Sequence, residues 1–179
     1  MDLSYGVEYE AFRAEARRFI EAHAHLAPRG LALDREKLRA WRTLLIENGY
    51  AARDVPKEYG GYGAEPDILK SRIIAEEFAR AKITQGHGAQ GMAYLVPTLL
   101  DLGTEEQKRR FVGPTLRAEI LWCEGFSEPN AGSDLASLST SAVLDGDEWV
   151  VNGQKIWTST AREADWMFCL VRTEPDAPK

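Results

Sequence analysis

The chain has 179 residues, of which 44% are hydrophobic and 28% charged, a composition typical of a globular protein. Its net charge of -6 argues against a nucleic-acid-binding protein and provides no overall attraction for an anionic ligand. The longest apolar stretches fall far short of a membrane span, and the N-terminus has neither the basic region nor the apolar core of a secretory signal.

Residues 1–118 show the periodicity of helices. Apolar residues spaced three and four apart predict two helices, over residues 12–20 and 38–45, and Gly49 follows the second as a stop signal. A third helix is expected to begin near Pro66 and Asp67, with its apolar face formed by Ile68, Ile73, Ile74, Phe78 and Ala79.

Two more helices are predicted in this half of the chain. The fourth covers residues 92–102 and is expected to be interrupted or kinked at Pro97. The fifth begins at Thr104, which together with Gln107 three residues later forms a capping-box pattern.

The period changes to that of strands from about Ile120. Residues 139–144 and 149–156 are predicted to be two strands joined by a hairpin turn over 145–148, Asp-Gly-Asp-Glu. Residues 164–172 form another predicted strand, and together these strands are expected to make an open sheet with an unprotected last edge. Cys123 and Cys169 lie in strand-like runs, and a pair of buried free thiols is the simplest interpretation, which fits a cytoplasmic protein.

These patterns predict an α+β protein with two domains. An all-α helical domain is expected over residues 1–118, and an incomplete antiparallel β domain over residues 119–179.

Two segments of the second domain have the composition of a ligand site. Residues 126–134, Phe-Ser-Glu-Pro-Asn-Ala-Gly-Ser-Asp, form a turn of small residues whose backbone N–H groups can converge on an anion. Residues 152–159, Asn-Gly-Gln-Lys-Ile-Trp-Thr-Ser, end a strand-like run with an aromatic ring and two hydroxyls, which suits a flat heteroaromatic ligand. Together they predict a site for a dinucleotide that carries a planar ring.

These two segments resemble the Thr/Ser-Glu-Pro-x-Ala-Gly-Ser-Asp and Gly-x-Lys-x-Trp elements of the acyl-CoA dehydrogenase family of flavoproteins. Three earlier segments also match the family in order: residues 55–63 with Val-Pro-Lys-Glu-Tyr-Gly-Gly-Tyr-Gly, the pair Glu76-Glu77, and residues 103–108. The similarity runs from about Phe12 to Arg172. Because a complete family member continues into more strands and a C-terminal helical bundle, the resemblance implies an N-terminal part from which that bundle is missing.

The resemblance implies FAD as cofactor and an acyl-CoA thioester as substrate, oxidised to the 2,3-enoyl-CoA in fatty acid and lipid metabolism. It places Phe126 and Ser127 beside the pyrimidine side of the flavin, and Trp157, Thr158 and Ser159 beside its ring. Ser133 is placed at the FAD pyrophosphate and near the pantetheine of CoA. The alternatives are a core aromatic closing the sheet for Trp157, and a turn with an Asx cap for Ser133 and Asp134.

Gln90, Met92 and Tyr94 are candidates for the acyl pocket, since the family's corresponding helix flanks the acyl chain; a role as plain core is the alternative. The family's catalytic base is a Glu in or near the C-terminal bundle, beyond Lys179, so no catalytic residue is assigned in this chain and the chain alone is expected to be inactive. Glu128 is interpreted as a structural carboxylate of the turn.

The resemblance further implies an electron-transferring flavoprotein or similar acceptor and a homo- or hetero-oligomer. Two other functions remain open: a related flavin oxidase or monooxygenase, and a subunit of a mixed assembly that does not supply the base. The glycines at 60, 61 and 63 indicate a tight turn, because no dinucleotide or Walker pattern surrounds them. The three histidines, at 23, 25 and 87, show no metal-ligand spacing.

Overall fold

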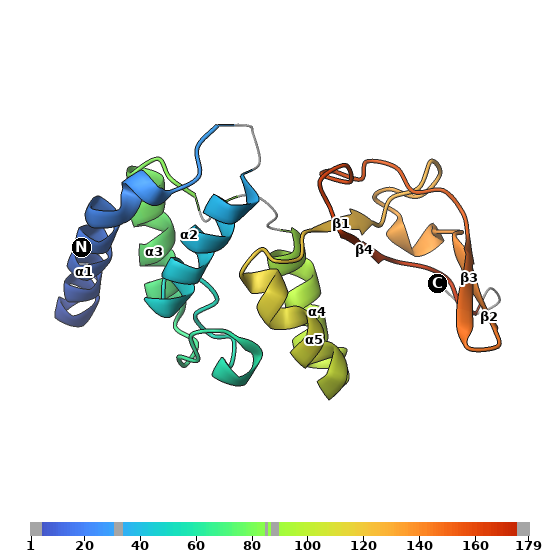
Figure 1. Ribbon diagram of the computed structural model, residues 1–179, viewed down its shortest axis with the longest axis horizontal. Helices are drawn as coiled ribbons and strands as arrows, with labels where there is room; N and C mark the ends of the chain where they lie inside the picture. The colour runs from blue at the N-terminus through green and yellow to red at the C-terminus, as the bar shows by residue number, and fades with distance from the viewer. Residues whose placement is uncertain (1–4, 31–33, 85, 87–89, 175–179) are drawn as a thin grey trace. The chain divides into compact units, whose positions relative to one another are not determined.

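The computed structural model describes residues 5–30, 34–84, 86 and 90–174 (Figure 1). The chain divides into two compact units, Met1–Glu119 and Ile120–Lys179. Helices make up the first unit and short strands the second, so the predicted α+β class is confirmed.

The predicted helices of the first unit are all present. Two of them begin where predicted, each with a side-chain cap: the Asp67 carboxylate accepts a hydrogen bond from the Lys70 amide, and Thr104 and Gln107 form the predicted reciprocal capping box. The α-helices are α1 (Val7–His23), α2 (Arg35–Glu47), α3 (Ile68–Arg80), α4 (Val96–Leu102) and α5 (Glu105–Leu116). Short 3₁₀ turns lie at Ala24–Leu26 and Lys57–Tyr59.

The predicted fourth helix is two segments. A π-helical turn, Gly91–Leu95, leads into α4, and Pro97 stands in the first turn of α4. A proline is tolerated there because the N–H groups of the first turn have no intrahelical partner. The irregularity expected at Pro97 therefore lies just before it, where the π turn widens the helix.

The apolar faces of these helices form one core. Ala16 and Ile20 of α1, Trp41 and Leu45 of α2, and Phe78 of α3 are all buried in it. The Trp41 indole N–H donates to the Thr84 carbonyl at 2.9 Å, which satisfies its one donor. Ile68 was predicted on this face and is instead 85% exposed, because it occupies the first helical position after the Asp67 cap.

A buried carboxylate joins α1 to α3. Glu77 of α3 is 2% exposed and accepts from Arg17 at 2.9 and 3.0 Å, from Arg80 at 2.7 Å and from Arg13 at 3.3 Å. The hydrogen bonds from Arg17, aided by those from Arg80 and Arg13, outweigh desolvation and lower the pKa of Glu77 to about 2. The Glu76-Glu77 pair noted in the sequence thus serves, at Glu77, to tie two helices together.

Two short two-stranded sheets are found among the described residues of the second unit. β2 (Ser141–Asp145) and β3 (Glu148–Asn152) form the predicted antiparallel hairpin. Gly146 stands first in its two-residue turn with a φ of 61°, which glycine adopts without strain. β1 (Trp122–Gly125) instead pairs in parallel with β4 (Trp166–Cys169), so the expectation of a purely antiparallel single sheet is wrong in this detail.

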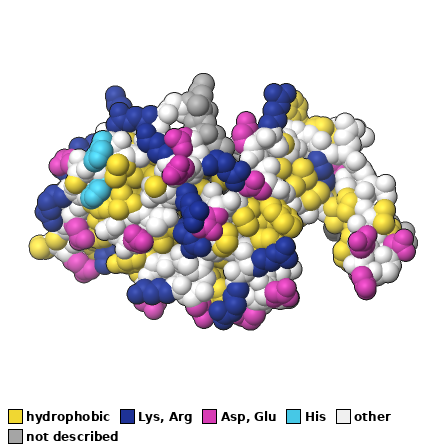
Figure 2. Space-filling view, viewed as in Figure 1, with side chains coloured by type: hydrophobic (Ala, Val, Ile, Leu, Met, Phe, Trp, Pro, Cys, Tyr) yellow, Lys and Arg dark blue, Asp and Glu magenta, His cyan; other side chains and the backbone are white. Residues whose placement is uncertain are grey.

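The hairpin exposes apolar side chains on both faces. On the side that Figure 2 shows, apolar side chains of this part lie beside acidic ones. Cross-strand partners share a face, so Val143 with Val150 lies on one side and Leu144 with Trp149 on the other, all about half exposed. Between β1 and β4, Cys123 is buried as expected, whereas Cys169 is only half-buried; both thiols are free. Among the residues that the structure describes, no helix is long and apolar enough to cross a membrane.

We predict that Glu77→Gln lowers the free energy of unfolding by about 1–3 kcal/mol, since three arginines lose the negative charge and one of the two acceptor oxygens that they share. Glu76→Gln is the matched control: its side chain is 38% exposed, and the loss should stay below about 1 kcal/mol. Urea denaturation measures both. Equal losses of unfolding free energy in the two variants would contradict the claim that the buried position of Glu77 makes its interactions stronger than those of Glu76.

The same site predicts a pH dependence. Folding depresses the pKa of Glu77, so the unfolded chain binds the proton first. The contribution of Glu77 is therefore complete above about pH 5 and is lost as the pH falls toward about 2. The difference in unfolding free energy between wild type and Glu77→Gln should shrink over this range, and a difference independent of pH would refute the assignment.

Candidate functional site

A buried ion pair connects the two segments singled out in the sequence. The Lys155 ammonium lies 2.8 Å from the Glu128 carboxylate, and the two side chains are 8% and 4% exposed. The other acceptor positions of Glu128 are also filled: the Ser139 amide and hydroxyl donate at 2.7 and 2.8 Å, and the Thr140 amide at 2.8 Å. Glu128 is therefore the structural carboxylate that the sequence indicated.

The charge state of Glu128 follows from these contacts. Desolvation opposes its ionisation, but the hydrogen bonds from Lys155 and Thr140 and from the Ser139 amide outweigh it. The pKa of Glu128 consequently lies well below its ordinary value. A carboxylate held in this way is a poor proton acceptor, which excludes Glu128 as a general base near neutral pH.

The backbone places the two segments directly beside each other. The Ile156 amide donates to the Ser127 carbonyl at 2.9 Å, and the Lys155 ammonium donates to the Phe126 carbonyl at 3.1 Å. Phe126 and Ser127 are thereby set next to the segment that begins with Trp157. Lys155 had no role in the sequence interpretation, although it is the lysine of the Gly-x-Lys-x-Trp pattern, and that pattern was the available signal.

Trp157 does not close a core. Its side chain is 86% exposed, and its backbone is left-handed with a φ of 57°, an unusual conformation for a bulky residue. The Ser159 amide donates to the Trp157 carbonyl at 2.9 Å, which makes a tight turn at this point; Thr158 is half-buried and Ser159 exposed. A large flat side chain is thus exposed on a strained turn, and strained backbone of this kind clusters at active sites and ligand-binding segments.

The small-residue turn is hydrogen-bonded within itself at its first residues and exposed to solvent at its last ones. Glu128 and Ala131 exchange two backbone hydrogen bonds, at 2.8 and 3.1 Å, so their amides are used within the turn. Gly132, Ser133 and Asp134 follow as exposed residues. Asp134 stands at the N-terminus of a 3₁₀ turn, Leu135–Ser137, and does not cap that turn through its side chain, as the alternative of an Asx cap would require.

The three candidate acyl-pocket residues lie in the helical unit, at or next to the π turn. Met92 is half-buried, packs against the core and lines a cavity of about 370 Å³. Gln90 is half-buried and Tyr94 is 52% exposed, and neither lines that cavity. Met92 therefore makes core contacts and also lines a cavity of the helical unit.

The glycine loop is a turn, as predicted. The amides of Gly60, Gly61 and Gly63 donate to carbonyls within the same loop, and a Cβ on Gly61 would lie 2.2 Å from the Val55 carbonyl. These amides cannot cradle a phosphate while they make those bonds. His87 lies outside the described residues, and no group of His, Cys, Asp and Glu within residues 5–30, 34–84, 86 and 90–174 has the arrangement of a metal site.

Comparison with known protein families identifies a domain in each half of the chain. Residues 7–119 match the acyl-CoA dehydrogenase N-terminal domain, and residues 123–179 match the acyl-CoA dehydrogenase middle domain. Acyl-CoA dehydrogenase IpdE1 of Mycobacterium tuberculosis is 45% identical over 141 residues, which cover 78% of this chain and 36% of that protein.

Two solved structures extend the comparison. The ChsE4-ChsE5 complex from Mycobacterium tuberculosis contains a chain that is 35% identical, with a TM-score of 0.75. The match covers 98% of the present chain and 45% of the chain in that complex. The Tcur3481-Tcur3483 steroid ACAD contains a chain that is 35% identical, with a TM-score of 0.76. That match covers 99% of the present chain and 46% of the matched chain. The chain thus spans less than half the length of each of these three proteins.

The buried pair yields a stability prediction. Lys155→Met should lower the free energy of unfolding by about 3 kcal/mol, because it leaves the Glu128 carboxylate buried beside an apolar group. The double variant Glu128→Gln/Lys155→Met should lose less than the sum of the single variants, since neither charge remains. Glu148→Gln, an exposed carboxylate of the same unit, is the control. Urea denaturation followed by tryptophan fluorescence tests this, and strictly additive losses would contradict coupling.

Proposed function

This chain belongs to the acyl-CoA dehydrogenase family, and from that premise we propose that it forms the part of an FAD-dependent acyl-CoA dehydrogenase that contacts cofactor and substrate. The complete enzyme would oxidise an acyl-CoA thioester to the 2,3-enoyl-CoA. The single observation that carries the proposal is the buried Glu128–Lys155 pair, which sets Phe126 and Ser127 beside the exposed Trp157 turn.

The residues available at this site fit a flavin dinucleotide. Trp157 offers an exposed aromatic surface, and Thr158 and Ser159 offer hydroxyls beside it. Ser133 lies in the exposed end of the small-residue turn, where a hydroxyl and nearby backbone amides suit a pyrophosphate. FAD, when bound, would supply the hydride acceptor, and the protein would supply position and electrostatics.

The reaction also requires a base for the α-proton of the thioester. Glu128 is excluded by its ion pair, and none of the acidic residues of the chain matches the base motif of the family. We therefore assign the base to polypeptide outside residues 1–179 and propose that this chain alone does not dehydrogenate acyl-CoA. General base catalysis typically contributes about 100- to 10,000-fold, so its loss alone would slow turnover by about that factor.

The structural relatives support a mixed assembly and a steroid-type substrate class for this protein. Both named structures contain two different proteins, ChsE4 with ChsE5 and Tcur3481 with Tcur3483, which supports a mixed assembly with a second subunit for this protein as well. The second is described as a steroid ACAD, which supports including steroid-type CoA esters among the substrates. An electron-transferring flavoprotein or similar protein would reoxidise the flavin.

Flavin binding and turnover test the proposal. In the complete polypeptide that carries these residues, Trp157→Ala should weaken FAD binding by about 3- to 10-fold, and Ser133→Ala should also weaken it. Trp149→Ala, another exposed tryptophan of the strand unit, is the matched control and should bind FAD as wild type does. The 179-residue chain alone should hold little or no flavin, which its visible spectrum reports.

Turnover is measured with an artificial electron acceptor and a panel of fatty and steroid-type acyl-CoA esters. The complete polypeptide should be active, alone or with a partner subunit, and the 179-residue chain inactive. Oxygen consumption with a non-CoA substrate, and no reaction with any acyl-CoA, would replace the dehydrogenase proposal by the oxidase one. FAD binding with turnover only after addition of a partner would establish the mixed assembly.

A further inference from the structure

A cavity of about 310 Å³ lies in the helical unit. Its volume is at the lower end of the range found for small-molecule sites in proteins. It is formed by the second half of α2, the loop that contains the 3₁₀ turn Lys57–Tyr59, and the residue that follows α5. The side chains that line it are Thr43, Ile46, Glu47, Lys57, Tyr62 and Arg117. None of these residues has a role in the proposed function.

The walls of this cavity are held in place by contacts behind them. Arg117 donates through its Nε atom to the Glu119 carboxylate at 3.0 Å, which fixes the plane of the guanidinium. The guanidinium also packs on the loop, because a Cβ on Gly60 would lie 3.0 Å from one of its terminal nitrogens. The Tyr62 ring lies against Gly49, where a Cβ would be 2.9 Å from the ring. A cavity with walls fixed in this way needs little rearrangement to take a ligand.

The side chains around the cavity offer more donors than acceptors. Lys57 and Arg117 are cations, Thr43 and Tyr62 carry hydroxyl groups, and Glu47 is the one carboxylate that lines the cavity among the described residues. Within the part of the chain that the structure describes, Arg117 makes its side-chain hydrogen bond only through Nε, and its two terminal nitrogens remain available. The Lys57 ammonium has no hydrogen bond or ion pair to any described residue. The cavity therefore carries a local excess of positive charge in a chain whose net charge is -6.

The loop can contribute side chains to a ligand but not its amides. The amides of residues 60–63 already donate to carbonyls within the same loop. A ligand must therefore be bound through the cations and hydroxyls, which suits an anion with several acceptor oxygens. Ile46 is 7% exposed and Tyr62 is half-buried, so the same cavity offers apolar surface beside the charged groups.

We propose that this cavity binds a phosphate monoester, with Lys57 and Arg117 contacting the phosphate and the organic part lying against Ile46 and the Tyr62 ring. A phosphate monoester carries about two negative charges near neutral pH and three acceptor oxygens, which matches two cations and a nearby hydroxyl. The terminal nitrogens of an arginine can hold two of these oxygens at once, and a lysine supplies a point charge. The inference goes beyond the proposed function and depends on neither FAD nor acyl-CoA.

Phenyl phosphate is the probe, titrated into the complete polypeptide at about pH 8 and low ionic strength and followed by ³¹P NMR. Lys57→Met should weaken its binding by about 5- to 10-fold, because a charge-assisted contact is lost. Glu47→Gln should instead strengthen it by about 2-fold or more, because the variant removes a repelling charge. Both ligand-free variants should melt within about 2 °C of wild type, since surface substitutions of this kind change stability little.

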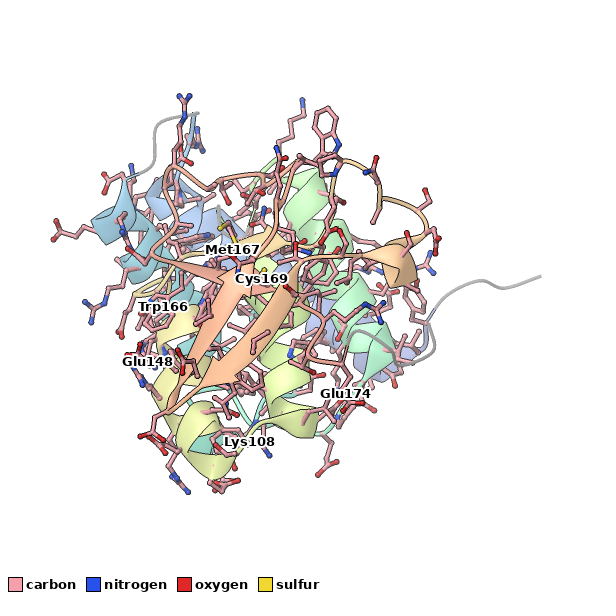
Figure 3. The ribbon with its side chains drawn as sticks, turned by 90° about the vertical axis from the view of Figure 1, so that its right-hand side faces the viewer. Lys108, Glu148, Trp166, Met167, Cys169 and Glu174 are labelled. Carbon is pink, nitrogen blue, oxygen red and sulfur yellow. The ribbon has the colours of Figure 1, made fainter. Side chains whose placement is uncertain are left out.

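Two matched variants control for the overall charge of the protein. Lys37→Met removes an exposed lysine of α2 that does not line the cavity, and Glu148→Gln removes an exposed carboxylate of β3 (Figure 3). Each should bind phenyl phosphate within about 2-fold of wild type. Changes as large as those at positions 57 and 47 would show attraction by net charge alone and would overturn the site.

The remaining outcomes test the class of ligand. Inorganic phosphate should bind at least about 3-fold more weakly than phenyl phosphate, because it lacks the apolar part. Equal affinity for the two would overturn the assignment to a monoester, and equal affinity for benzoate would overturn the assignment to phosphate. Absence of any phenyl phosphate binding by the wild-type polypeptide would overturn the inference entirely, while leaving the proposed function intact.

Discussion

The arrangement of the candidate site depends on one buried interaction, the ion pair between Glu128 and Lys155. A carboxylate and an ammonium that are both almost fully buried are stable only when matched closely, and here three further donors complete the carboxylate. Each partner belongs to a different motif of the acyl-CoA dehydrogenase family. The pair therefore converts two segments that are distant in sequence into one local structure, and the Ser127–Ile156 backbone hydrogen bond fixes their register.

The groups assigned to the ligand lie on the outside of this buried link. Trp157 is exposed on a left-handed turn, and Ser133 is exposed at the open end of the small-residue turn. Neither position gains stability from its exposure, and the turn at Trp157 carries strain. A buried, fully satisfied pair beneath an exposed and strained surface is the arrangement expected when local structure is fixed in advance for binding.

Local signals in the sequence predicted local structure well. Helix periodicity, the start of the third helix near Asp67, the Thr104–Gln107 capping box and the Asp145–Glu148 turn all depend on neighbours within a few residues, and all were confirmed. The parallel pairing of β1 with β4 was missed because its partners are distant in sequence and apolar alternation does not encode strand direction. The buried arginine Arg42, which donates to the Thr115 carbonyl, was missed for a related reason: its acceptor belongs to another helix. Motifs likewise identified the two site segments, whereas the Glu128–Lys155 contact that joins them required the fold.

Hydrogen–deuterium exchange of the complete polypeptide, with and without FAD, tests the central claim most directly, because it reports on both segments at once. If the ion pair joins them into one flavin site, FAD should slow exchange in residues 126–134 and in residues 155–160 together, and Lys155→Met should weaken both effects. The glycine loop at residues 60–63, whose amides are already bonded within the loop, should not change. Protection confined to one of the two segments, or protection centred on the glycine loop, would contradict the account.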